Sequence, residues 1–118
     1  PTVWQLTSTV EATLRPGTTL VDLLRATFPC GSVTGAPKVR TMEIIASLES
    51  VPRGVYTGMI ALLRPGGDVV SSVPIRTAVL DRTTGSARFH VGAGITADSR
   101  VNEEWAECLA KARVVRPP

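Results

Sequence analysis

Residues 55–91 read VYTGMIALLRPGGDVVSSVPIRTAVLDRTTGSARFHV, and this stretch decides the fold class. Its apolar runs are rich in aliphatic and β-branched residues, which predicts strands. Two turn sequences separate the runs, PGGD at 65–68 and DRTTG at 81–85. Both are hairpin-type turns, and consecutive hairpins join antiparallel neighbours. The stretch therefore predicts an antiparallel three-stranded meander, with strands at 55–63, 69–80 and 87–91.

Helical patterns lie on both sides of the predicted meander. Each has apolar residues at helical spacing and a residue suited to a helix start, such as Thr19 or Pro37. Residues 3–14 alternate loosely and predict one more strand. The resulting fold class is α+β, an antiparallel sheet with flanking helices. The predicted helices run over 20–27, from 37 to about 50, and from 98 or 99 to about 115.

The composition argues against several classes of function. The 118 residues are 43% hydrophobic and 19% charged, which is typical of a folded domain or a piece of one. The net charge is +3, but the arginines are scattered and aromatic residues are only 4%, so we expect no nucleic-acid partner. The longest aliphatic run, 59–63, is too short to cross a membrane. Two cysteines and one histidine predict neither a zinc site nor a disulfide framework, and reduced thiols suit a cytoplasmic protein.

The loop GSVTGAPK at 31–38 precedes one of the predicted helices. Free backbone N–H groups and the positive end of a helix dipole make such a place suited to an anion. The loop is not a P-loop, because Ala-Pro separates Lys38 from Gly35 and no Ser or Thr follows the lysine. A tight turn with a capped helix is the simpler interpretation, and spacing alone favours it.

The last predicted helix carries Glu104 and Glu107 on one face, with Lys111 four residues further along the same face. Two carboxylates so placed could hold a hard cation such as Mg²⁺, with water and substrate oxygens completing its shell. The lysine would then lie near a bound anion. The competing interpretation is a solvated helix face with an ordinary i,i+4 ion pair, and the pattern on its own favours that.

Further candidates lie in and after the predicted strands. Gly92 and Gly94 could let backbone approach a ligand closely, or could merely permit a bend. Arg76, expected inside a strand, calls for a carboxylate partner from the protein or a ligand. Tyr56 could share that anion through its hydroxyl, or could simply pack with its tip at the surface. His90 alone is read as a strand surface residue.

Four stretches, taken in order, resemble the C-terminal part of the chorismate-binding enzymes. They cover nearly the whole chain, and their agreement in order and register makes the resemblance specific. The stretches are FPCGSVTGAPKVRTMEII at 28–45, RGVYTG at 53–58, IRT at 75–77 and GAGITADSRVNEEWAECLAK at 92–111.

The resemblance implies a fold and a set of site residues. The family has a four-layer α/β/β/α catalytic domain about twice this length, so residues 1–118 would be its C-terminal half, with the N-terminal half absent. Glu104 and Glu107 resemble the family's Mg²⁺ ligands, and Lys111 resembles a lysine near the ring carboxylate of the substrate. The remaining matches are Arg76 and Tyr56 at the enolpyruvyl carboxylate, Gly92 and Gly94 as backbone lining the substrate, and Ser32 with Gly35 in the loop beside it.

Within the family, GSVTGAPK at 31–38 resembles the aminodeoxychorismate synthase branch. Gln5 stands where many members have a catalytic histidine, and glutamine cannot donate a proton at neutral pH. This branch aminates chorismate at C4 on the way to p-aminobenzoate and folate, with ammonia from a glutamine amidotransferase. The alternatives are anthranilate synthase component I and a non-catalytic chorismate-binding half-domain. The family's attacking lysine and acid lie outside this chain, so alone it should be inactive and should self-associate.

Overall fold

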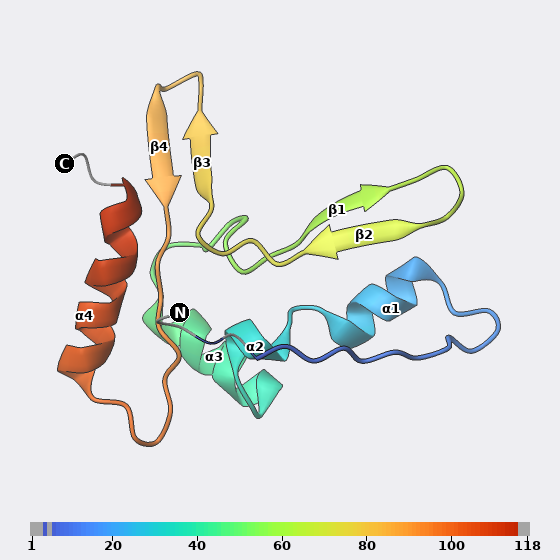
Figure 1. Cartoon of the computed structure of the whole chain (residues 1–118), viewed down its shortest axis with the longest axis horizontal. Helices are drawn as coiled ribbons and strands as arrows, with labels where there is room; N and C mark the ends of the chain where they lie inside the picture. Colours follow the sequence, from blue (N-terminus) through green and yellow to red (C-terminus); the bar gives the residue numbers. More distant parts are fainter. Residues whose placement is uncertain (1–3, 5, 116–118) are drawn as a thin grey trace.

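The computed structural model describes residue 4 and residues 6–115, and it has the α+β composition that the sequence predicts (Figure 1). No helix in this described part of the chain is long and apolar enough to cross a membrane. The helices are α1 (Leu20–Thr27), α2 (Gly31–Thr34), α3 (Lys38–Leu48), α4 (Val101–Ala112) and the short 3₁₀ turn η1 (Arg113–Val115). The strands are β1 (Ile60–Leu63), β2 (Val69–Ser72), β3 (Ala78–Asp81) and β4 (Ser86–Phe89).

The strands form two separate antiparallel hairpins, so the prediction of one three-stranded meander is wrong. Strand β1 pairs with β2, in register from Ile60 opposite Ser72, and β3 pairs with β4. The predicted strand at 69–80 breaks at 73–77, where Pro74 cannot donate to a ladder and Arg76 has a φ of 51°. The two hairpins consequently point in different directions (Figure 1).

The predicted strand at 3–14 is also wrong over its described part, since residues 4 and 6–14 lie in no strand. A strand needs the backbone groups of a neighbouring strand, and neither hairpin extends its ladder to this segment. The alternating side chains are therefore present in this segment, but no neighbouring strand pairs with its described residues. Gln5 lies outside the described residues.

The helices begin close to where the sequence places them. Thr19 and Asp22 form a capping box at α1: the Asp22 N–H donates to the threonine hydroxyl, and the Thr19 N–H donates to the aspartate. The Thr19 hydroxyl also donates to the Asp22 carboxylate at 2.6 Å, and this bond together with that from the Thr19 N–H lowers the pKa of Asp22. Helix α4 starts later than expected, at Val101, because the residue before it, Arg100, has an extended backbone with φ −113° and ψ 129°.

The chain is more open than a closed domain of its size. Its accessible surface is 10437 Å², whereas a compact 12.5 kDa monomer exposes roughly 6,200 Å². Its radius of gyration is 17.3 Å, against about 13.5 Å for a compact chain of this length. Among the described residues only Pro74 is buried, and no valine, leucine or isoleucine of that part of the chain is buried. Its apolar faces therefore lie open to solvent.

These exposed faces predict that the isolated chain self-associates, because contiguous apolar surface drives association. In β1, Leu62 is exposed, and Leu62→Lys should reduce the association that light scattering detects as concentration rises. Ser72→Lys is the matched control, since it adds the same charge on the paired strand without removing apolar surface. A wild-type chain that stays monomeric at all concentrations would contradict the expectation.

Candidate functional site

An open cleft of about 1140 Å³ lies between the loop before α3, the segment around residues 53–57 and the segment 90–96. Apolar side chains of α3, among them Ile44, Ile45 and Leu48, form one wall. The cleft brings together residues that are far apart in the sequence. All seven residues that the sequence proposes as substrate-binding line it: Ser32, Gly35, Tyr56, Arg76, Gly92, Gly94 and Lys111.

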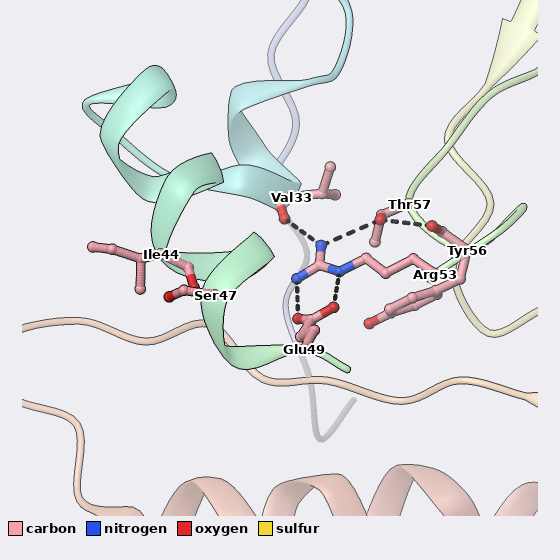
Figure 2. A network of polar contacts seen from close by, with 7 residues as sticks. All are labelled: Val33, Ile44, Ser47, Glu49, Arg53, Tyr56 and Thr57. Atoms are coloured by element: carbon pink, nitrogen blue, oxygen red, sulfur yellow. Dashed lines mark hydrogen bonds and ion pairs between the residues drawn. The ribbon is translucent and has the colours of Figure 1, made fainter. Parts of the chain in front are cut away.

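Arg53 forms the polar network that joins the walls of this cleft (Figure 2). Its Nε and Nη2 donate to the two carboxylate oxygens of Glu49 at 2.7 and 2.6 Å. Its Nη1 donates to the Val33 carbonyl at 3.2 Å and to the Thr57 hydroxyl at 3.3 Å. One half-buried guanidinium thus connects α2, the C-terminal end of α3 and the Tyr56–Thr57 turn.

The electrostatics of the Glu49–Arg53 pair agree with this geometry. The hydrogen bonds from Arg53 lower the pKa of Glu49 despite partial burial, and the charge of His90 adds a smaller effect in the same direction. The same hydrogen bonds raise the pKa of Arg53. Both groups therefore remain charged at neutral pH. Partial exposure screens the pair, so its main contribution is geometric.

Tyr56 lies at the junction of two cleft walls. Its ring meets His90 edge-on, with centroids 5.4 Å apart, and the Arg53 guanidinium carbon lies 6.0 Å from its centroid. Its hydroxyl reaches Gly92 so closely that a Cβ at that position would lie 2.7 Å from the oxygen. Position 92 therefore requires glycine for as long as the tyrosine keeps this pose.

Arg76 is presented by the backbone that connects β2 to β3, rather than by the strand that the sequence suggests. Both Arg76 and Thr57 have positive φ, 51° and 59°. The Thr57 N–H donates to the carbonyl of buried Pro74 at 2.8 Å, which ties the segment of Tyr56 to the segment of Arg76. Two left-handed, non-glycine residues in segments joined by this bond indicate that the surrounding contacts fix this part of the cleft.

The loop before α3 is compact because small residues close it. Gly35 has a φ of 106°, and a Cβ there would approach Cγ2 of Thr41 to 3.2 Å. Ser32 lies in the one-turn helix α2, which the sequence analysis did not predict, and the hydroxyl of Thr34 at the end of that turn donates to the Cys30 carbonyl.

Helix α4 contributes Lys111 to the cleft. Its ammonium donates to the Gly92 carbonyl at 2.7 Å and forms an ion pair with Glu107. The two proposed metal ligands do not line the cleft surface themselves. Glu104 accepts from the Ser99 hydroxyl at 2.6 Å, while its other oxygen, Oε2, is buried and has no hydrogen-bond partner within the described structure.

The carboxylates of α4 are the candidate metal ligands of the site. No cluster of three or more His, Cys, Asp or Glu side chains that could hold a metal occurs in the described part of the chain. Mg²⁺ is held in many sites by one or two carboxylates together with water and substrate oxygens. The orphaned oxygen of Glu104 suits that chemistry, because a buried acceptor without a partner is costly unless a donor or cation completes it.

Arg53 is the residue of the site that the sequence analysis missed. The RGVYTG stretch contains it, and its spacing of four residues from Glu49 is typical of an ion pair. That spacing gave no hint of the contact with Val33, which is 20 residues away.

The sequence predicts His90 as a surface residue, but it is half-buried and lines the cleft beside Tyr56.

Comparison with known proteins agrees with the motifs. Residues 1–117 match the family described as chorismate binding enzyme. An aminodeoxychorismate synthase of Streptomyces griseus is 49% identical over 111 residues, covering 94% of this chain and 15% of that protein. Anthranilate synthase component 1 is 45% identical in Methanothermobacter marburgensis and 43% in Neisseria gonorrhoeae, each over 113 residues that are 96% of this chain and 24% and 23% of those proteins. The chain spans a quarter or less of these relatives.

The contact between Tyr56 and Gly92 predicts a coupled pair of substitutions. Gly92→Ala should lower the free energy of unfolding by about 1 kcal/mol, because the new methyl overlaps the tyrosine hydroxyl. Adding Tyr56→Phe removes that oxygen and should recover most of the loss. Urea unfolding of the two single variants and the double variant measures the coupling. Purely additive effects would show that the hydroxyl does not lie against Gly92.

Proposed function

The chain belongs to the chorismate-binding enzyme family, and on that basis we propose that it forms the C-terminal part of a catalytic domain that aminates chorismate at C4. The single observation that carries the proposal is the cleft, which is lined by all seven residues proposed to bind substrate. The cleft has an apolar wall for a ring and carries cationic side chains, Arg76 and Lys111. A cyclic dicarboxylate such as chorismate needs both.

Each end of the substrate finds a suitable partner in this arrangement. Arg76 and the Tyr56 hydroxyl would hold the enolpyruvyl carboxylate, because a guanidinium fork matches carboxylate geometry. Lys111 would lie near the ring carboxylate. Two of its three N–H donors go to the Gly92 carbonyl and Glu107 among the described residues, which leaves one to face a ligand. Gly92 and Gly94 let the backbone lie close to the ring.

We further propose that Glu104 and Glu107 contribute to a Mg²⁺ site. The buried, unpartnered Oε2 of Glu104 supports this, as do the hard oxygen donors of both residues. A magnesium ion held there by Glu104 and Glu107 would supply positive charge for the ring carboxylate and for the departing hydroxyl. In this proposal Lys111, which lines the cleft and pairs with Glu107, would bring the ring carboxylate near those glutamates.

The choice of amination at C4 rests on local sequence. The loop GSVTGAPK and glutamine at position 5 both favour the aminodeoxychorismate synthase branch, and the 49% identity to the Streptomyces griseus protein agrees. In this proposal the attacking lysine and its acid come from a preceding half-domain, and a glutamine amidotransferase supplies ammonia. The second candidate is anthranilate synthase component I, which the 43% and 45% identities to proteins of that name favour.

A product assay distinguishes the candidates. The complete protein that contains this chain, given chorismate, Mg²⁺ and ammonium, should form a product that yields p-aminobenzoate only when a lyase activity is present. The isolated 118-residue chain, run beside it, should give no turnover. A directly fluorescent anthranilate product would identify the second candidate. No consumption of chorismate by the complete protein would favour a non-catalytic half-domain.

The metal proposal predicts the behaviour of two neighbouring glutamates. In the complete protein, Glu104→Gln should raise the Mg²⁺ concentration needed for half-maximal activity by at least about ten-fold, because it removes a ligand charge. Glu103→Gln is the matched control, since its exposed side chain pairs with Arg100 at 3.6 Å and lies outside the cleft. Magnesium titrations of both variants should differ. An unchanged midpoint for Glu104→Gln would contradict the assignment.

A further inference from the structure

We infer that Arg53 is a positioning residue, which sets the placement of Tyr56 and of the Ser32–Thr34 turn across the cleft. This inference rests on the proposed function, because those two elements are the proposed contacts to chorismate. Arg53 lines the cleft, but the hydrogen bonds of its guanidinium go to the protein itself: its side chain bonds Glu49, Val33 and Thr57 (Figure 2).

The guanidinium of Arg53 is almost fully used. Four of its five N–H donors are accounted for by the four hydrogen bonds to Glu49, Val33 and Thr57. The bidentate contact with Glu49 fixes the plane of the group against the end of α3. With the plane fixed, the donors of Nη1 are aimed at two elements whose separation they define.

One Nη1 contact reaches the loop wall. Val33 lies in α2 between Ser32 and Thr34, both of which line the cleft. Its carbonyl accepts from Arg53 at 3.2 Å, over a sequence separation of 20 residues. The position of the Ser32 side chain relative to the rest of the site therefore depends on this contact.

The other Nη1 contact reaches Tyr56 through a relay. Arg53 donates to the Thr57 hydroxyl at 3.3 Å, and that hydroxyl donates to the Tyr56 carbonyl at 2.6 Å. The Thr57 backbone is in a left-handed conformation and also bonds Pro74, two residues before Arg76. Because the Tyr56 hydroxyl already touches Gly92, a small movement of its backbone displaces the group proposed to meet the carboxylate.

Lysine cannot reproduce this arrangement. Its ammonium is a compact charge without the planar fork, so it can pair with Glu49 but cannot hold the carboxylate bidentately and reach Val33 and Thr57 together. Arg53→Lys in the complete protein should therefore raise the chorismate KM by roughly ten-fold, with a smaller change in kcat, because binding geometry is lost while the reacting groups remain. Arg40→Lys is the matched control, since Arg40 forms an exposed ion pair with Glu43 on the same helix and lies outside the cleft.

A charge-exchanged pair separates positioning from simple stabilisation. Glu49→Arg combined with Arg53→Glu restores an ion pair at the end of α3, but a glutamate at position 53 cannot donate to the Val33 carbonyl. The melting temperature should recover relative to either single variant, while the KM stays raised. Recovery of the KM to the wild-type value would overturn the inference, because the ion pair alone would then be sufficient.

Amide hydrogen exchange gives a readout that needs no turnover. Arg53→Lys should increase the exchange rate at the Thr57 N–H, which bonds Pro74, whereas Arg40→Lys should leave it unchanged. Equal rates in the two variants would overturn the positioning role whatever the enzyme's activity. A complete wild-type protein that does not consume chorismate, yet shows this difference in exchange, would overturn the proposed function and leave the positioning role supported.

Discussion

The fork between Arg53 and Glu49 is the interaction on which the rest of the cleft depends. It joins the end of α3 both to α2 and to the Tyr56–Thr57 turn, in a chain whose described residues otherwise enclose little interior. Where apolar burial is sparse, directional polar contacts define relative positions, because hydrogen bonds fix distance and orientation while hydrophobic contact does not. The Arg53 guanidinium makes four hydrogen bonds, two of them to a carboxylate, so it fixes the relative positions of these three segments.

Helix α4 provides a second contact that fixes the cleft. Lys111 on α4 donates a hydrogen bond to the Gly92 carbonyl, which holds the last helix against the segment that contains Gly92 and Gly94. The Tyr56 hydroxyl also lies close to Gly92, so both contacts involve the same glycine. Tyr56 and Lys111, which are proposed to bind different carboxylates of the substrate, are therefore linked through the backbone of Gly92.

The local elements could be predicted from the sequence, and the tertiary contacts could not. Turn residues at 65–68 and 81–85 identified both hairpins, and Thr19 identified the start of α1, because these signals act over a few residues. The sequence did not reveal the interruption at 73–77, because the β-branched residues of 69–80 favoured a strand despite Pro74. The left-handed backbone of Arg76 has no signal in the sequence. Motif matching selected residues that converge on the cleft, whereas the reach of Arg53 to Val33 required the fold itself.

The most direct measurement is a crystal structure of the complete protein with chorismate bound. We expect the ligand in this cleft, with its enolpyruvyl carboxylate against Arg76 and Tyr56 and its ring carboxylate toward Lys111 and the α4 glutamates. The four hydrogen bonds of Arg53 should be intact. Chorismate bound elsewhere, or bound here with the Arg53 fork open and Tyr56 turned away from Gly92, would contradict this expectation.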